Sequence, residues 1–382
     1  MDSFNTSELR KLTLDQEGPC ITIFLSTHAA GHDGQQDALR LKNLVGQAER
    51  ELTEQGLRAP DAKKLLDPVR QLPKEPGFWE KRSNGLAIFI SQGVFDRFRI
   101  PLELDETVIV NRRFQVKPLL PLLGSNDRYF VLAFSQNRVR FFKGSRFGLD
   151  EMTIDGMPKD MDQALNLDGA DRGSQVHSAM RGDQGKQSAV FHGQGGSREA
   201  AKDDLAQYFR MIDTALRDTL RGQRAPLFLA AVQYLLPIYR EVSSYAHIAK
   251  KELPGNPDHS PEHELHVRVW PLVESFAEDA REAAAAKYRK LAGTGKTSDD
   301  IRQIVPAAHQ GQVETLFVDR SDHQWGVFEP DTGKLELRSP QQPGDDDLLD
   351  YAAVQTLLHR GGVYAVPSDQ SPSPPAAAVF RY

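Results

Sequence analysis

The chain has a single cysteine, Cys20, so no disulfide can form within it. No run of 18 consecutive apolar residues occurs, which excludes an ordinary membrane-spanning helix. The first residues, 1–5, have neither the basic nor the apolar region of a secretory signal, so none is expected. Together these features predict a cytoplasmic protein in a reducing compartment.

An excess of positive charge is also missing. The sequence has 47 Lys and Arg against 53 Asp and Glu, a formal net charge of −6. Proteins that coat DNA or RNA through their overall charge are therefore excluded, and any phosphate contact must come from a basic patch placed by the fold.

Complete catalytic motifs are absent too. We find no Gly-x-Ser-x-Gly elbow, no His-Glu-x-x-His and no Gly-x-Gly-x-x-Gly after a strand. Residues 293–297 resemble the end of a phosphate-binding P-loop, but Lys290 replaces its first glycine and a helix is expected before it. A helix–helix loop with a capped start is the favoured interpretation, and no catalytic residue is predicted.

Histidines are the remaining candidates for metal binding. Two groups have suitable spacing: His259, His263 and His266, and His28 and His32 with Asp33. Neither has a cysteine nearby, and the acidic neighbours of the first group are typical of a solvated helix. We favour structural roles and predict no metal and no other cofactor.

Hydrophobic periodicity predicts an α/β fold with three α/β domains, in which mixed sheets are flanked by helices. The expected domains are 1–124, 125–292 and 293–382. Expected strands are 20–26, 85–91, 93–100, 107–110, 128–134, 138–143, 227–232, 312–318, 361–367 and 376–382, with a hairpin turn at 331–333. Expected helices are 36–54, 60–72, 201–222, 274–291, 301–309 and 345–360, with a further helix starting at 260. We expect Pro68 to shorten or kink its helix, Pro271 to break the helical region after 260, and 117–124 to be a linker or rigid crossover.

Two regions of the middle segment attract functional interest. Residues 168–197 are rich in Gly, Ser, Asp and Gln, so we expect weak order there in the free protein, with a long helix starting within a few residues of Ser197. Alternation in the basic run 138–146 would place Arg138, Arg140 and Phe142 on one strand face, suited to phosphate contact. The alternative is an ordinary solvated face with Val139 and Phe141 packed inside. The RNA-contact candidates are Arg138, Arg140, Lys143, Arg146, Arg181 and Lys186.

A family resemblance rests on the segment between that loop and the long helix, which reads His192, Gly193, Gln194, Gly195, Gly196, Ser197 and Arg198. It resembles the His-Gly-x-Gly-Gly-Gln-Ser loop in the middle domain of class-one eukaryotic and archaeal release factors. Residues 301–318 and 348–364 resemble the carboxy-terminal domain of the same proteins. With these motifs in order along the chain, the protein is identified as a member of the bacterial archaeo-eukaryotic release factor family, related to Pelota.

The resemblance implies a loop that reaches the peptidyl-transferase centre, but Ser197 stands where the family has its glutamine, and Gln194 lies on the other side of the glycine pair. The first domain also lacks the Asn-Ile-Lys-Ser segment used to read stop codons. We therefore predict a ribosome-associated factor in rescue, stalling response or hibernation, which occupies the tRNA site without hydrolysis. The implied partners are ribosomal RNA, tRNA and a translational GTPase docked on the carboxy-terminal domain. Two alternatives stay open: a peptidyl-tRNA hydrolase with an altered loop, and a stress-related interaction module away from ribosomes.

Overall fold

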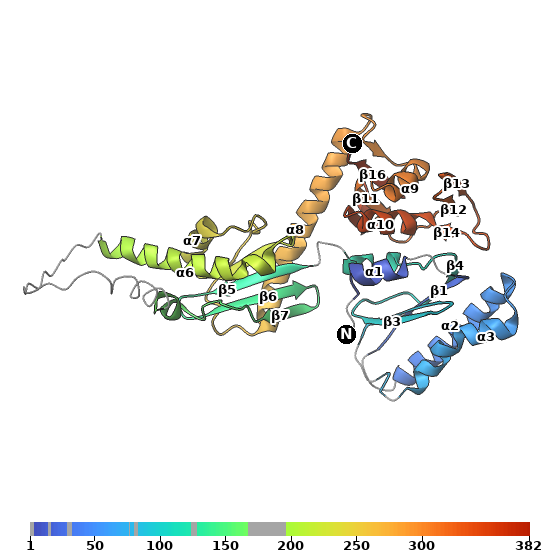
Figure 1. Ribbon diagram of the computed structural model, residues 1–382, viewed down its shortest axis with the longest axis horizontal. Helices are drawn as coiled ribbons and strands as arrows, with labels where there is room; N and C mark the ends of the chain where they lie inside the picture. The colour runs from blue at the N-terminus through green and yellow to red at the C-terminus, as the bar shows by residue number, and fades with distance from the viewer. Residues whose placement is uncertain are drawn as a thin grey trace, which may run out of the picture. The chain divides into compact units, whose positions relative to one another are not determined.

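The computed structural model describes residues 4–13, 17–28, 33–75, 77–79, 83–123, 128–166 and 196–382, without the side chains of 33–35 and 196–200. It separates into two compact units (Figure 1), one made of Met1–Gly124 with Ala280–Tyr382 and the other of Ser125–Asp279. The three-domain division stays a prediction. Among the residues described, no helix has the length and apolar character needed to cross a bilayer.

The first unit opens with an antiparallel sheet of order β3-β2-β1-β4. Its strands are β1 (Cys20–Ser26), β2 (Gly85–Ser91), β3 (Val94–Ile100) and β4 (Thr107–Asn111). β1 is apolar throughout because both of its faces are covered: Ile21 and Ile23 lie in one hydrophobic cluster, and Cys20 and Phe24 in another. All four strands are confirmed close to their predicted limits.

Two helices, α2 (Asp33–Glu54) and α3 (Ala59–Gln71), supply the apolar side chains that bury Ile21 and Ile23. The helix α1 (Thr6–Leu12) contributes to the cluster on the other face, and the 3-10 turn η1 (Leu72–Lys74) follows α3. The expectation that Pro68 shortens α3 is wrong, since the helix continues to Gln71. Burial of Leu66 and Val69 on either side of the proline stabilises the helical path.

The carboxy-terminal part of this unit has two further sheets, of order β10-β16-β11-β15 and β13-β12-β14. The strands are β10 (Thr297–Ser298), β11 (Val313–Asp319), β12 (Trp325–Glu329), β13 (Lys334–Leu337), β14 (Asp346–Asp347), β15 (Gly362–Val366) and β16 (Ala376–Phe380), with helices α9 (Ile301–His309) and α10 (Leu348–Leu358) and the turn η3 (Ser368–Gln370). The predicted helix 301–309 and the hairpin at 331–333 are confirmed. The last helix starts later than expected because Asp346 and Asp347 pair with β12.

Of the two interpretations of 117–124, a linker or a rigid crossover, the linker is wrong for the described residues. They form η2 (Lys117–Leu119) and α4 (Leu120–Leu123), and Lys117, Leu119 and Leu120 are buried. Prolines at the first positions of a helical turn are well tolerated, since the missing N–H has no helical partner there.

The second unit is a five-stranded mixed sheet of order β7-β6-β5-β8-β9. Its strands are β5 (Tyr129–Phe134), β6 (Val139–Ser145), β7 (Gly148–Met152), β8 (Leu227–Ala231) and β9 (Leu253–Pro254). The helices α6 (Gly196–Leu220) and α7 (Leu235–Val242) pack in one hydrophobic cluster with the sheet, and α8 (Glu262–Leu291) packs in the other. The predicted break at Pro271 is wrong: α8 is continuous, because Val269 and Val273 are buried against the sheet on either side of it.

Candidate functional site

The glycine-rich loop is only partly visible. His192, Gly193, Gln194 and Gly195 lie outside the described residues, as do Arg181, Lys186 and all but the last two residues of the region 168–197 where weak order is expected. Gly196, Ser197 and Arg198 form the first turn of α6, and only their backbone is described. The prediction that a long helix starts within a few residues of Ser197 is confirmed.

The helix that follows the loop is firmly anchored in the second unit. Tyr208 is fully buried, and its hydroxyl donates to the Ser135 carbonyl at 3.0 Å. Further along, buried Asp213 accepts from the Ser243 hydroxyl (2.8 Å) and the Ser244 hydroxyl (2.7 Å). Side-chain packing and these hydrogen bonds give the loop a fixed base at its carboxy-terminal end.

Arg140 is buried, so it lies neither on the expected phosphate-contacting face nor on the solvated face of the alternative. Its side chain is buried and donates to the carbonyls of Pro257 (2.6 Å) and Ser260 (3.0 Å), with the guanidinium 5.3 Å from the ring centroid of Phe142. Burial and the neighbouring Arg138 lower the pKa of Arg140. In this conformation Arg140 serves the packing of 257–260 and is closed to an RNA phosphate.

The other basic residues of the run are accessible. Arg138 is exposed and donates to the Asp258 carbonyl at 3.1 Å. Lys143 and Arg146 are exposed, and the Arg146 guanidinium lies 5.7 Å from the ring centroid of Phe147. RNA contact by these three residues stays a prediction.

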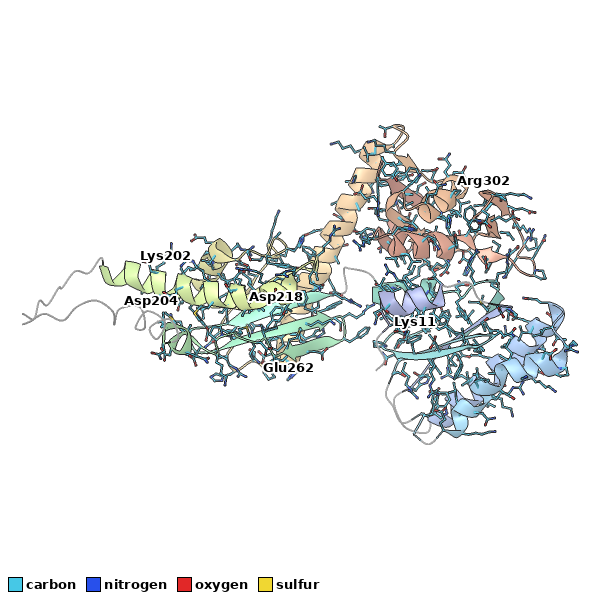
Figure 2. The ribbon with its side chains drawn as sticks, viewed as in Figure 1. Lys11, Lys202, Asp204, Asp218, Glu262 and Arg302 are labelled. Atoms are coloured by element: carbon cyan, nitrogen blue, oxygen red, sulfur yellow. The ribbon has the colours of Figure 1, made fainter. Side chains whose placement is uncertain are left out.

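The described surface of α6 carries both signs of charge, as Lys202, Asp204 and Asp218 illustrate in Figure 2. Exposed Arg210 and Arg217 are interspersed with these carboxylates. A basic track along the described part of this helix is therefore absent, and α6 is better suited to carrying the loop than to binding phosphates along its length.

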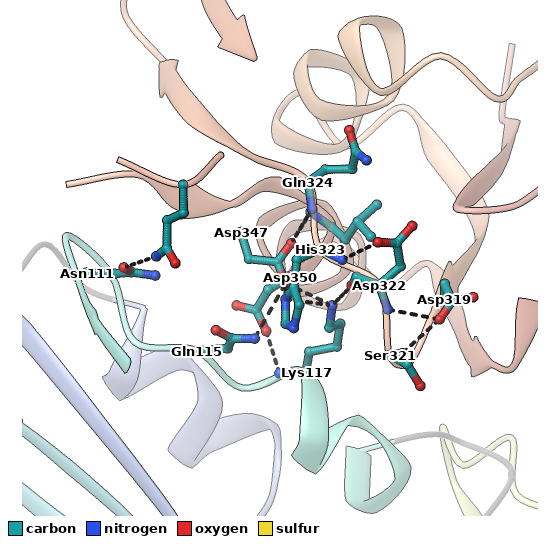
Figure 3. A network of polar contacts seen from close by, with 12 residues as sticks. Asn111, Gln115, Lys117, Asp319, Ser321, Asp322, His323, Gln324, Asp347 and Asp350 are labelled. Carbon is teal, nitrogen blue, oxygen red and sulfur yellow. Dashed lines mark hydrogen bonds and ion pairs between the residues drawn. The ribbon is translucent and has the colours of Figure 1, made fainter. Parts of the chain in front are cut away.

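The most elaborate polar cluster in the described chain lies in the first unit and was missed by sequence reasoning (Figure 3). Lys117 and Asp347 are each 1% exposed and form an ion pair, with 2.8 Å between Nζ and Oδ2. Nδ1 of His323 donates to the same Asp347 oxygen at 2.7 Å. Asp350 accepts the backbone N–H groups of Val116 (2.9 Å) and Lys117. The cluster joins the segment after β4 to the start of α10.

Opposite pKa shifts distinguish the two carboxylates of this cluster. Burial tends to raise the pKa of Asp347, but the His323 hydrogen bond and the charge of Lys117 outweigh it and lower that pKa. Burial and the charge of Asp347 raise the pKa of Asp350 to about 7, against the opposing backbone N–H groups. The arrangement stabilises the contact between the segment after β4 and the start of α10. The one signal of this polar cluster in the sequence was a lysine within the apolar run 116–120.

The metal and P-loop candidates form no ligand site in the described residues. His266 contacts the Ser145 carbonyl at 3.1 Å and stacks on Trp270, and His28 contacts Asp37 at 3.1 Å. His32 and the Asp33 side chain lie outside the described set, and within that set no His, Cys, Asp and Glu cluster has metal-site geometry. Residues 293–296 form a turn between α8 and β10, without the strand-to-helix geometry of a P-loop.

Comparison with known proteins gives one family match. Residues 128–312, just under half of the chain, match bacterial archaeo-eukaryotic release factor family 3. The resemblance inferred from the sequence is confirmed. The match spans the release-factor-like loop segment, the sheet of the second unit, α6 and α8. No curated protein sequence matches the chain.

Solved structures similar to this chain include further release-factor relatives. A ribosome-bound archaeal Pelota, from a model with ABCE1, has 11% identity over 100% of this chain and 95% of that one, with a TM-score of 0.40. Dom34 of S. cerevisiae, a translation termination-like factor interacting with Hbs1, has 9% identity over 76% and 75%, with a TM-score of 0.38. The archaeal termination factor aRF1 has 12% identity over 99% of both chains, with a TM-score of 0.25. TM-scores this low carry no argument beyond the family match.

Proposed function

We propose that this release-factor relative is a ribosome-associated translation factor that occupies the tRNA site during rescue, stalling response or hibernation. The observation that carries the proposal is the family match over 128–312, which includes the glycine-rich loop and its helix. The buried side chains of α6 anchor the helix that follows the loop. A loop that enters a narrow channel lined by RNA needs such an anchor.

Action without hydrolysis is part of the proposal. Ser197 occupies the position of the family's glutamine, and a serine hydroxyl is shorter and lacks the amide that helps to position water. The loop would then fill the peptidyl-transferase centre as a plug. Arg181, Lys186, His192 and Arg198 would bring positive charge to the RNA, so affinity should fall as salt rises.

The partners follow from the same family relationship. Ribosomal RNA and tRNA sites would contact the second unit, and residues 293–382 would dock a translational GTPase.

Sedimentation tests the ribosome assignment. Lysates of starved, cold-treated and drug-stalled cells are run on sucrose gradients, and we expect the protein in the ribosomal fractions of at least one. Replacement of Arg181, Lys186 and Arg198 by Glu reverses their charges and should move the protein to the top of the gradient. In the matched control, the same replacement by Glu is made at three exposed cations in or next to α3: Arg58, Lys63 and Lys64. A protein that stays at the top under every stress, in pull-downs free of ribosomal RNA, would instead be an interaction module away from ribosomes.

A peptide-release assay decides between a plug and a hydrolase. Purified protein is added to stalled ribosome–nascent-chain complexes, and we expect no release above background for the wild type or for Gln194→Ala. Release by the wild type that Gln194→Ala abolishes would identify the chain as a peptidyl-tRNA hydrolase and overturn the non-catalytic part of the proposal.

A further inference from the structure

An open groove of about 400 Å³ lies beside β4 in the first unit. Four consecutive residues of that strand, 107–110, contribute to its lining. Val108 and Val110 pack in the hydrophobic cluster that contains α2 and α3, whereas Ile109 packs against the cluster on the opposite face of the sheet. Because the groove touches successive residues that belong to both faces, it follows the edge of the strand, where the backbone is accessible.

The edge of β4 beside this groove is open to a further strand. In the described part of the chain, β4 is the last strand of its sheet and pairs only with β1. The carbonyl of Val110 points away from β1, since it accepts Nε2 of Gln55 at 2.9 Å. In an antiparallel ladder, alternate residues direct their N–H and C=O groups to the same side, so those of Val108 also face the groove. An unpaired edge of this kind is a template for another strand.

The two walls of the groove differ in chemistry. On one side, α2 contributes Glu51 and Glu54, and no Lys or Arg of the described chain belongs to the lining. On the other side lie His323 and Trp325, whose rings stack with centroids 5.0 Å apart and planes 14° apart. Successive side chains of a strand point to opposite sides, so a strand in this groove would meet negative charge on one side and an aromatic surface on the other.

We propose that this groove binds an extended, basic protein segment that adds to the sheet as a strand beside β4. Its backbone pairs with the open edge at Val108, and its Lys or Arg side chains face Glu51 and Glu54. The apolar side chains between them lie against Trp325. In strand addition, main-chain hydrogen bonds supply affinity and alternate side chains supply specificity. The proposal goes beyond the ribosomal role and does not depend on it, because no residue of the second unit takes part.

Calorimetric titration of the full chain with the peptide acetyl-Lys-Phe-Lys-Val-Lys-Phe-amide tests strand addition. Two further versions carry backbone N-methyl groups, one at the three lysines and the other at the three apolar residues. All three peptides have the same charge, but in a strand only one of these two sets directs its N–H groups toward β4. One methylated version should therefore bind at least about tenfold more weakly than the unmethylated peptide, because backbone hydrogen bonds are lost, and the other should bind like it. Absence of binding, or equal binding of all three peptides as simple charge attraction would give, overturns the proposal.

Charge reversal and hydrogen exchange locate the contact. Glu54→Lys should weaken binding of the unmethylated peptide by about tenfold, since it replaces attraction by repulsion. Asp67→Lys makes the same reversal at an exposed position of α3 outside the groove lining and should bind like the wild type. Addition of the peptide should slow amide exchange in residues 107–110. Slowing only elsewhere, or slowing that grows with protein concentration without peptide because a second copy of the chain pairs there, overturns the proposal.

Discussion

Lys117 is a charged side chain with 1% exposure, and its position depends on a carboxylate far away in the sequence. Because a buried charge is tolerated only with a partner, Lys117 and Asp347 must form their ion pair as the two halves of the first unit come together. His323 and the backbone N–H of Gln324 also donate hydrogen bonds to Asp347.

Removal of the cation should therefore be strongly destabilising. We expect Lys117→Met to lower the free energy of unfolding by about 3–5 kcal/mol, since it leaves Asp347 buried without its ion-pair partner. The double variant with Asp347→Asn should recover part of this loss. Urea denaturation measures both. Lys11→Met, which removes an exposed ion pair with Glu8, should change stability little, because such pairs are screened by solvent. Similar effects at both lysines would contradict the role assigned to Lys117.

Asp350 should give the protein a distinct pH dependence. Its pKa is raised from 3.8 to about 7, so between these values the folded state binds more protons than the unfolded state. The Asp350 contribution to stability consequently falls as pH rises from about 4 to about 7. Asparagine can still accept the two backbone N–H groups, so Asp350→Asn should remove this fall and stabilise the protein at pH 8 by on the order of 2 kcal/mol.

Unfolding free energies from pH 4 to pH 8 check this prediction. The control is Asp218→Asn, at an exposed position of α6, which should leave the shape of the curve unchanged. A curve for Asp350→Asn that runs parallel to the wild type would show that Asp350 is ionised throughout this range.

Close packing in the second unit restricts which residue types fit at particular positions of its strands. In β6, a Cβ at Gly144 would lie 2.3 Å from the ring of Tyr129, itself buried in the hydrophobic cluster with α8. Contacts below 3.0 Å force a neighbour to move, and a buried ring on a central strand has little room. The glycine is therefore required by packing.

Gly144→Ala should lower the free energy of unfolding by about 1–3 kcal/mol through overpacking. Gly46→Ala is the matched control: it lies in α2 with no atom within 4 Å of the added Cβ, and alanine favours helix by about 1 kcal/mol. Thermal denaturation should show a lower midpoint for the first variant and an unchanged or higher one for the second. A neutral Gly144→Ala would mean that the Tyr129 ring can move at little cost.

Over the whole molecule, the packing of each hydrophobic cluster decides which parts can fold alone. Among the described residues, the two clusters of the second unit draw only on residues between 129 and 273. In contrast, the cluster containing Phe24 and Phe89 includes Val354 of α10, and Lys117 needs Asp347. The first 124 residues are thus completed by the carboxy-terminal part of the chain.

Separate expression of segments tests this dependence. Residues 125–291, which include all of α8, should unfold cooperatively on heating. Residues 1–124 alone should show lower stability and a broad transition, because the α10 side chains and the partner of Lys117 are missing. Addition of residues 280–382 in trans should sharpen that transition. Cooperative, stable folding of 1–124 by itself would support the three-domain division predicted from the sequence.

The sequence by itself determined the local elements. Strands such as 20–26 and 85–91, the hairpin near 331–333, the helix 301–309 and the start of a long helix near Ser197 follow from side-chain periodicity and turn residues, which act over a few neighbours. The resemblance to the release-factor family was also readable from the sequence, and the family match over residues 128–312 includes the glycine-rich segment that carries it.

Only the tertiary structure decided which polar side chains are buried and which prolines are accommodated. Arg140 is buried by residues 257–260, and Lys117 by an aspartate 230 positions away, partners that no local pattern reveals. Pro271 stays inside α8 because burial of that helix against the sheet offsets the lost hydrogen bond. Such outcomes depend on the free energy of long-range packing, which exceeds the local preference of a single residue.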